Sequence, residues 1–326
     1  MPVTSVTKDP RALTMTVVAD FKVPLRRLWD AYIDPRQIEK FWGPPEWPST
    51  FTRHDARPGG RTEYAMHGPD GQVSRGYWEW VSVDAPNAFE VRDGFAGEDG
   101  ANNTDMPSMQ MRFEFSATNK GSRLVTTTHF RSAEELKQLL DMGMEDGMRG
   151  AMGQIDAVLA DLTSFAAGRA TWAQNLSDTQ VRVSRVIRGS VKQVWRAHHD
   201  ADLVRQWLLG PDGWIMVVCE VATAPGESWR YEWQRADASG RFGFSGEMQE
   251  AQAPHRAVFT ENLIGMDGPA TRNELTLTPV AGGTLMSLLI TYADREQRDA
   301  VLGTGMVDGM ETSYARLERE VLAAAS

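Results

Sequence analysis

The chain has 326 residues, of which 41% are hydrophobic and 24% are charged, and its formal net charge is −10. These values are typical of a globular protein with two ordinary domains, and the acidic balance disfavours nucleic acid and anionic membrane surfaces as partners. The single cysteine, Cys219, excludes an internal disulfide and any metal site built from several cysteines.

The start of the chain lacks the features of a secretory signal. Residues 1–20 contain neither a basic start followed by an apolar stretch nor a small-residue cleavage site. No apolar stretch approaches the roughly 20 residues that are needed to span a bilayer. We therefore expect a cytoplasmic protein without a membrane span.

The first elements expected are a strand over 13–22 and two short helices. Trp29 and Tyr32 lie three residues apart, on one face of the first helix. The Asp34-Pro35 pair ends that helix and starts the second, because proline suits the first turn of a helix.

About six strands are expected next. Met109, Met111, Phe113 and Phe115, for example, alternate with polar residues. A period of two is typical of an antiparallel sheet with one buried face. Because the strands follow one another directly, the pattern favours meander pairing over parallel crossovers.

A long amphipathic helix is expected at the end of this half. Met144, Met148, Met152, Ile155 and Leu159 are spaced 4, 4, 3 and 4 residues apart, which places them along one face. We expect this helix to lie across the concave face of a curved sheet.

Four glycines lie at matching places in two such helices, at 143, 147, 305 and 309. Each weakens a helix by about 1 kcal/mol relative to alanine. They therefore predict a close backbone approach or a mobile turn near the mouth of a pocket.

The second half of the chain repeats the first. Trp29 and Trp195 occupy similar segments 166 residues apart, and Gly-Met-Glu-Asp-Gly-Met at 143–148 returns as Gly-Met-Val-Asp-Gly-Met at 305–310. Matches in the same order with nearly constant spacing indicate a tandem duplication. We expect a first copy at 1–165, a linker at 166–178 and a second copy at 179–326.

These motifs resemble the SRPBCC/START superfamily of Bet v 1-like, helix-grip proteins. The motifs that show the resemblance are Val-Pro-x4-Trp-x-Ala from Val23, Phe-Trp-Gly-Pro-Pro from Phe41, Pro-Gly-Gly-Arg from Pro58 and the closing Gly-Met helix. The branch that they resemble most is the C-terminal domain of the heat-shock-protein-90 ATPase activators and its small bacterial relatives. The resemblance implies two α+β helix-grip domains, each a curved antiparallel sheet around a long C-terminal helix, with a deep hydrophobic pocket.

Pocket candidates are the residues expected to face inward. In the first copy they are Phe41, Tyr64, Met66, Phe113, Thr126, Thr128, Met144 and Met148. In the second copy they are Trp207, Tyr231, Trp233, Phe244, Leu277, Leu288, Met306 and Met310. For each of them, simple packing in the core is at least as good an interpretation as lining a cavity.

One strand differs between the copies. Thr126 and Thr128 of the first copy align with Leu288 and Ile290 of the second. Buried hydroxyls need partners, which a ligand or water can provide. We therefore predict a roomier and more polar first pocket and a fuller second one.

Catalytic motifs are scarce. The sequence has no metal-ligand spacing of histidines, no nucleophile elbow and no phosphate loop, so we expect no metal and no cofactor. His198 and His199 are adjacent on a helix and point apart, and Cys219 lies in an apolar run where a buried, inert thiol is expected. Arg53-His54-Asp55 and Glu63 are the one acid–base combination worth considering, and the second copy does not repeat it.

Three functions remain open at this point. The favoured one is binding of a small hydrophobic or amphipathic ligand, such as a lipid, polyketide or aromatic metabolite, in a helix-grip cavity. The second is an enzyme similar to the polyketide cyclases or hydrolases of the superfamily. The third, less favoured, is a co-chaperone-like module that docks on a chaperone partner through exposed apolar surface.

Overall fold

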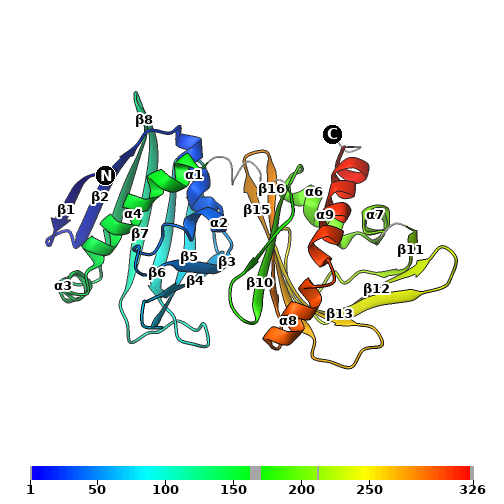
Figure 1. Ribbon diagram of the computed structural model, residues 1–326. Coiled ribbons are helices and arrows are strands. Elements are labelled where there is room, and N and C mark those ends of the chain that lie inside the picture. Colours follow the sequence, from blue (N-terminus) through cyan, green and yellow to red (C-terminus); the bar gives the residue numbers. More distant parts are fainter. Residues whose placement is uncertain (1, 162–169, 211–212, 324–326) are drawn as a thin grey trace. The chain divides into compact units, whose positions relative to one another are not determined.

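Two compact units, residues 1–165 and 166–326, make up the chain (Figure 1). The structure is a computed structural model that describes residues 2–161, 170–210 and 213–323. Each unit contains one eight-stranded antiparallel sheet and helices near its end. The α+β class and the tandem duplication predicted from the sequence are confirmed.

The first sheet is a meander with one strand pair added at its end. Its order is β1-β2-β8-β7-β6-β5-β4-β3. The strands are β1 (Val3–Asp9), β2 (Thr14–Phe21), β3 (Ser49–His54), β4 (Arg61–His67), β5 (Val73–Asp84), β6 (Ala88–Phe95), β7 (Ser108–Thr118) and β8 (Gly121–His129). The six consecutive strands β3–β8 confirm the predicted meander. Strand β1 was not expected, because most of its side chains are exposed and it shows no alternation of apolar residues.

Two short helices separate β2 from β3. They are α1 (Leu25–Ile33) and α2 (Pro35–Ile38). Trp29 and Tyr32 of α1 are buried, as predicted. The Asp34 carboxylate accepts a hydrogen bond from the Arg36 backbone N–H, and proline follows it at the first position of α2, so the predicted break between the helices is confirmed.

The closing helix lies across the inner face of the first sheet (Figure 1). It is α4 (Met144–Ala160), preceded by the separate helix α3 (Ala133–Asp141). Met152, Ile155 and Leu159 of α4 join the strands in one buried core. The predicted apolar face of the helix is thus the face that packs against the sheet.

Two alternative roles were predicted for the glycines of the closing helices, a close backbone approach or a mobile turn, and the structure contradicts the first. Gly143 has a φ of +85° and Gly305 a φ of +80°, and each caps the helix that follows it. No heavy atom lies within 4 Å of a Cβ built at Gly143, Gly147, Gly305 or Gly309. The predicted close backbone approach is therefore wrong. Gly143 and Gly305 are required by the left-handed backbone that turns one helix into the next.

The second sheet repeats the first. Its order is β11-β12-β13-β14-β15-β16-β10-β9. The strands are β9 (Trp172–Asn175), β10 (Gln180–Ile187), β11 (Trp214–Glu220), β12 (Ser228–Arg235), β13 (Arg241–Gln252), β14 (Arg256–Leu263), β15 (Thr271–Val280) and β16 (Gly283–Thr291). Strand β9 lies inside the segment expected as a linker, so that part of the segment belongs to the second sheet.

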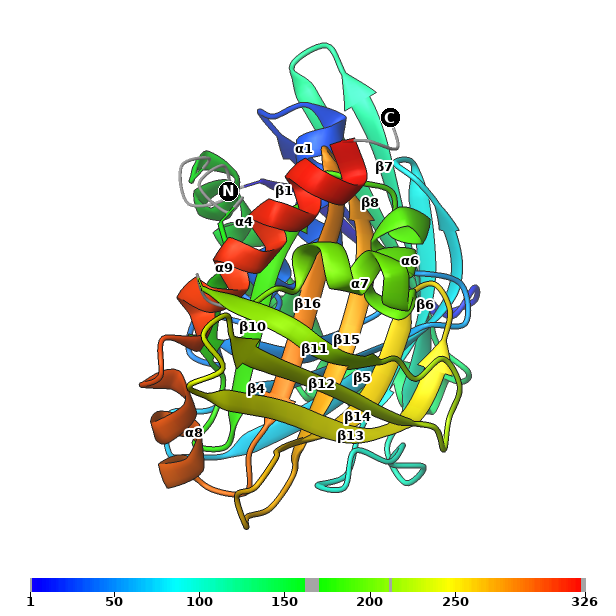
Figure 2. The same cartoon turned by 90° about the vertical axis from the view of Figure 1, so that its right-hand side faces the viewer.

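The helices of the second unit follow the same plan. They are α6 (Val191–His199), α7 (Ala201–Trp207), α8 (Arg295–Leu302) and α9 (Met306–Arg316), and α9 continues into the π-helical turn η1 (Leu317–Leu322). Figure 2 shows α9 crossing in front of the strands, with α6 and α7 beside it. Among the described residues, no helix is long and apolar enough to cross a membrane.

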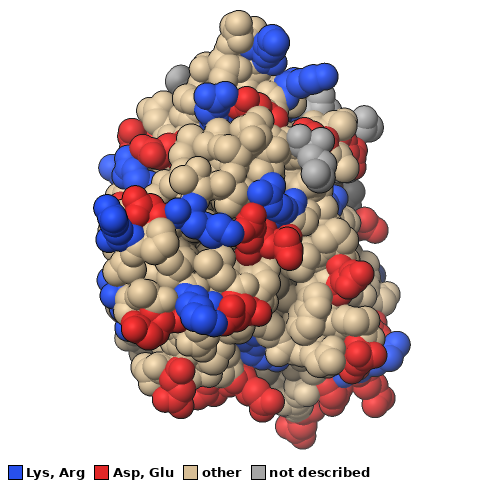
Figure 3. All heavy atoms as spheres, turned by 90° about the vertical axis from the view of Figure 1, so that its left-hand side faces the viewer, with Lys and Arg blue, Asp and Glu red and all other residues tan. Residues whose placement is uncertain are grey.

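The charged surface carries both signs. On the face drawn in Figure 3, Lys and Arg are interspersed with Asp and Glu. Ion pairs join neighbouring strands of the first sheet, with Arg123 2.7 Å from Asp20 and Arg92 2.7 Å from Glu79. This face therefore offers no continuous basic surface of the kind that a nucleic-acid backbone requires.

Candidate ligand-binding site

An acidic residue recurs on the inner face of both sheets. The Ala-Pro pairs at 85–86 and 253–254 are 168 residues apart, and the same offset aligns Asp93 on β6 with Glu261 on β14. Because side chains alternate along a strand, Asp93 shares its face with the core residues Phe89 and Val91. Glu261 shares its face with Ala257 and Phe259 in the same way.

In the first copy, the acid is held by protein donors. Asp93 Oδ1 accepts a hydrogen bond of 3.0 Å from the Tyr64 hydroxyl and one of 2.8 Å from Trp78 Nε1. Burial raises the pKa of the Asp93 carboxyl to about 7, and the two hydrogen bonds partly offset this effect. Asp93 and Tyr64 therefore form a closed polar network inside an aromatic core.

In the second copy, the acid lacks such donors. Glu261 is partly accessible, and within the described ranges its carboxylate has neither a hydrogen bond nor an ion pair; its partial burial raises its pKa to about 7. Burial raises the pKa values of Tyr231 and Tyr292, and the negative charge of Glu261 raises both further, so both phenols lie within its electrostatic reach. The Tyr292 hydroxyl is buried and has no hydrogen-bond partner in the described structure.

One exchange removes one of the two donors. The offset of 168 residues places Gly246 of β13 where the first copy has Trp78. In the second copy, the indole near this point comes from Trp229 of β12, and its Nε1 donates to the Thr260 carbonyl at 3.2 Å. The second copy therefore has an indole in this region, but its N–H binds the backbone instead of the acid.

The two cores also differ in continuity. The first copy has one buried core cluster, whereas the described core of the second copy divides into two clusters. Leu288 and Met310, both only partly buried, pack against both of these clusters. Leu288 and Met310 therefore connect the two clusters of the second interior.

Matched aromatic residues are less accessible in the first copy than in the second, although the sequence predicted a roomier first pocket. Tyr64 and Phe113 of the first copy are buried, whereas Tyr231 and Phe244 of the second remain partly accessible. The Thr126 and Thr128 hydroxyls are fully buried without a partner in the described structure, so the first interior is polar, as predicted. Its aromatic side chains are more completely buried than their counterparts in the second copy.

The predicted pocket residues all lie in the two interiors. Those that are buried are Phe41, Tyr64, Phe113, Thr126, Thr128, Trp207, Trp233 and Leu277. Those that are partly buried are Met66, Met144, Met148, Tyr231, Phe244, Leu288, Met306 and Met310. Sequence reasoning missed Asp93, Glu261 and Tyr292. Aligning the copies on their Ala-Pro pairs would have revealed the repeated acid.

The acid–base combination considered from the sequence does not form one site. His54 is buried, with Nδ1 2.9 Å from Thr62 Oγ1 and Nε2 3.0 Å from the Tyr32 carbonyl. The Thr62 hydroxyl also accepts a hydrogen bond from Trp80 Nε1 at 2.9 Å. Both ring nitrogens of His54 therefore serve to hold neighbouring elements together.

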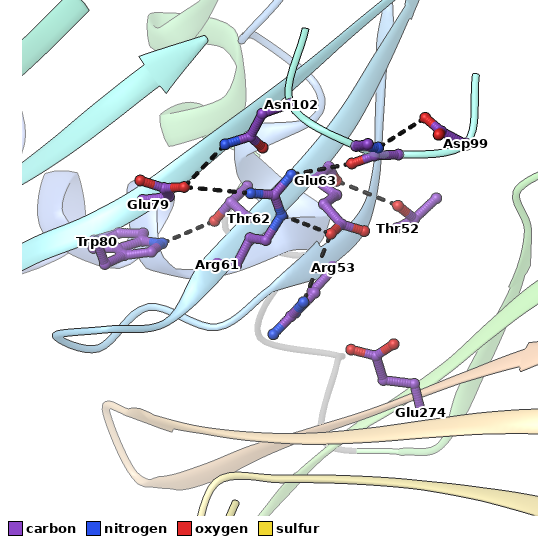
Figure 4. Close-up of polar contacts among 12 residues, drawn as sticks. Thr52, Arg53, Arg61, Thr62, Glu63, Glu79, Trp80, Asp99, Asn102 and Glu274 are labelled. Atoms are coloured by element: carbon purple, nitrogen blue, oxygen red, sulfur yellow. Dashed lines mark hydrogen bonds and ion pairs between the residues drawn. The ribbon is translucent and has the colours of Figure 1, made fainter. Parts of the chain in front are cut away.

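Glu63 belongs to an ionic network on the outer face of the sheet (Figure 4). Its carboxylate lies 2.8 Å from Arg61 Nε and 3.6 Å from Arg53 Nη1. Arg61 also lies 3.7 Å from Glu79, on the neighbouring strand. Since Glu63 alternates with the inward-facing Tyr64, its charge is on the opposite side of the sheet from the interior.

The described residues give little support for a metal site or for a nucleophilic cysteine or histidine. The described part of the chain has no group of three or more His, Cys, Asp or Glu side chains placed to hold a metal ion. Burial lowers the pKa of His198 to about 4 and raises the pKa of the Cys219 thiol. A buried thiol with a raised pKa is a poor nucleophile.

An open depression of about 480 Å³ lies on the outer face of the second sheet. Polar and charged residues dominate its lining, which consists of Glu220, Ser228, Trp229, Arg230, Ser245, Gly246, Glu247, Thr260 and Asn262. It lacks the apolar surface that encloses most small ligands. The interior beside Glu261 is therefore the better candidate.

Comparison with known proteins agrees with the fold. The model of the family described as Activator of Hsp90 ATPase homolog 1-like protein matches residues 22–160 and 188–321. Protein Ms6760 from Mycobacterium smegmatis is 48% identical over 48% of this chain and 97% of its own, with a TM-score of 0.46. A protein from Arthrobacter aurescens is 40% identical over 49% of this chain and 94% of its own, with a TM-score of 0.47.

Another solved structure matches most of the chain. DynU16, described as a putative protein in the dynemicin biosynthetic locus, is 16% identical over 94% of this chain and 98% of its own, with a TM-score of 0.34. No curated protein matches the chain. Since the family model matches well over half of the chain, in two successive segments, this protein belongs to the family of Activator of Hsp90 ATPase homolog 1-like proteins and contains its domain twice.

Proposed function

We propose that the second copy binds a small amphipathic molecule in its interior and that the first copy is a closed partner domain. One observation carries the proposal. The Tyr292 hydroxyl is fully buried without a hydrogen-bond partner in the described structure, and it lies within the electrostatic reach of the partly accessible Glu261 carboxylate. Unpaired buried polar groups cost free energy, and a ligand that supplies their partner recovers it.

The surrounding surface suits the rest of such a ligand. Phe244, Leu288 and Met310 are apolar and partly accessible, so a ligand can cover them without displacing packed side chains. Each 100 Å² of apolar surface covered in this way contributes about 2.5 kcal/mol. The polar groups would then fix the orientation and the apolar surface would provide most of the affinity.

A neutral fluorescent dye tests this proposal in the full-length chain. We expect 6-propionyl-2-dimethylaminonaphthalene to bind with a stoichiometry of one per chain and to show a blue-shifted emission. Met310→Trp should abolish this binding by filling the second interior, whereas Met148→Trp, at the matching position of the first copy, should not. Binding that survives Met310→Trp, or that is lost only in Met148→Trp, would contradict the proposal.

A further inference from the structure

The chemistry around Glu261 narrows the class of ligand. The inner positions near it present two phenols, Tyr231 from β12 and Tyr292, which directly follows β16. No positive charge of the described residues offsets the effect of burial on the Glu261 carboxyl. The protein therefore supplies an unbalanced negative group at this point of the interior.

The other ionisable groups that interact electrostatically with the two phenols do not neutralise the charge of Glu261. Arg298 of α8 acts on Tyr292, but its guanidinium is bound to the Ser177 carbonyl at 2.6 Å and to Asp299 at 2.7 Å. The Cys219 thiol acts on Tyr231 and carries no positive charge. On the covering helix α9, Glu311 is paired with Arg185. A cation for Glu261 must therefore come from outside the described residues.

Aromatic rings surround the same region. The Tyr231 ring lies 5.1 Å from that of Trp229 and 6.3 Å from that of Trp233, measured between centroids. Phe244 pairs with Tyr231 across the two strands. The faces of aromatic rings attract cations, and the attraction grows when water is excluded. A carboxylate among such rings favours an organic cation and repels an anion.

Resting on the proposed function, we infer that the ligand of the second copy is an apolar molecule with a basic nitrogen. Its ammonium group pairs with the Glu261 carboxylate beside the Tyr231 and Tyr292 rings, and its apolar part covers Leu288 and Met310. The first copy cannot bind such a ligand in this way, because Tyr64 and Trp78 already occupy its acid.

Three probes with the same alkyl chain distinguish a cationic from a neutral or an anionic ligand: octylamine, 1-octanol and octanoate. Each is titrated into the full-length chain at pH 8, and its binding is measured by calorimetry. We expect octylamine to bind at least about tenfold more tightly than octanol, as a charge-assisted hydrogen bond implies, and octanoate to bind least. Glu261→Gln should weaken octylamine binding about tenfold or more and leave octanol binding within about twofold. Glu247→Gln makes the same charge change at an exposed position and should alter neither.

The pH dependence supplies a second readout. Below pH 7 the Glu261 carboxyl takes up a proton, so octylamine binding should weaken about tenfold per pH unit and level off above pH 7. Octanol binding should not follow this curve, and octylamine binding to Glu261→Gln should lose it. Unchanged hydrogen exchange of β14 in Glu261→Gln would show that the variant remains folded.

The outcomes separate this inference from the proposed function. Octanol binding that is as tight as octylamine binding and is blocked by Met310→Trp would overturn the cationic ligand and leave the binding site in place. Equal effects of Glu261→Gln and Glu247→Gln would also overturn it. If none of the three probes binds and the neutral dye fails as well, both proposals are wrong.

Discussion

The inward-facing acid of the first copy has hydrogen-bond donors, whereas that of the second copy has none among the described residues. Asp93 has its two donors, and its carboxyl titrates near neutrality because it is buried. Glu261 has a similarly raised pKa and no donor in the described structure. The exchange of Trp78 for Gly246 removes one of the two donors, and Tyr231, at the place of Tyr64, makes no hydrogen bond to Glu261 in the described structure.

The raised pKa of Asp93 predicts a pH-dependent stability of the first copy. Its ordinary pKa is 3.8 and its value in the fold is about 7, so the protonated form is favoured in the folded state. The contribution of this group is fully present below about pH 4 and is lost as the pH rises to about 7. Asp93→Asn should therefore stabilise the first copy at pH 8, by on the order of a few kcal/mol, and much less at pH 5.

Native-state hydrogen exchange of a peptide from β6 measures this effect in the full-length chain. Asp105→Asn, at an exposed loop position, serves as the control for the charge change. A stability gain that is the same at pH 5 and pH 8 would rule out the titration of Asp93 as its cause.

The buried threonines of β8 allow a second test. Thr126 and Thr128 have hydroxyls without a partner in the described structure, and valine has nearly the same shape as threonine. If the first interior is dry, Thr126→Val should leave the free energy of unfolding unchanged or raise it by about 1 kcal/mol. Thr62→Val should lower it by about 1–3 kcal/mol, because the Thr62 hydroxyl binds His54 and Trp80.

Urea denaturation, monitored by hydrogen exchange of β4 and β8, would compare the free energy of unfolding of these two variants. A loss of stability in Thr126→Val as large as that in Thr62→Val would show that the Thr126 hydroxyl has a bound partner, such as water or a ligand.

At the scale of elements, the closing helices depend on one backbone conformation. Gly143 lies in the left-handed region and Gly147 lies inside α4, and a methyl group added at either position would meet no heavy atom within 4 Å. Gly143→Ala should destabilise the first copy by about 1–2 kcal/mol, because alanine is strained there. Gly147→Ala should stabilise it by about 0.5–1 kcal/mol through helix propensity.

Thermal unfolding of the two variants separates these effects, since both add one methyl group to the same helix. Equal shifts in the midpoint would mean that the chain does not need the left-handed turn at Gly143. The same pair of substitutions at Gly305 and Gly309 would repeat the test in the second copy.

The elements themselves were largely predictable from the sequence. Alternation along β7, the spacing of apolar residues along α4 and the Asp34-Pro35 break are local signals, and each is confirmed. Strands β1 and β9 were missed because their exposed side chains give no alternating pattern. The separation of α3 from α4 was missed, because the apolar pattern does not reveal a positive φ at Gly143.

The site was less predictable, because it depends on contacts between distant strands. Asp93 and Glu261 look like surface acids along their own strands, and only alignment of the copies reveals the repeated inward position. The size of each interior depends on exchanges such as Thr62 for Trp229 and Trp78 for Gly246, which compensate one another in space. Comparing Thr126 with Leu288 alone therefore did not predict that Tyr231 and Phe244 are more accessible than Tyr64 and Phe113.

At the scale of the whole molecule, duplication has produced two domains with the same fold and different interiors. The family model matches both copies. One interior is filled by its own aromatic side chains, and the other has a divided core and an unpaired acid among the described residues. Such a pair can keep one domain rigid while the other accepts a ligand.

A crystal structure of the full-length chain with octylamine tests this account most directly. We predict one octylamine molecule per chain, with its nitrogen within hydrogen-bond distance of the Glu261 carboxylate and its alkyl chain against Leu288 and Met310. The first interior should remain closed around Tyr64 and Asp93. Octylamine bound beside Asp93, or a second interior filled by its own side chains, would contradict the account.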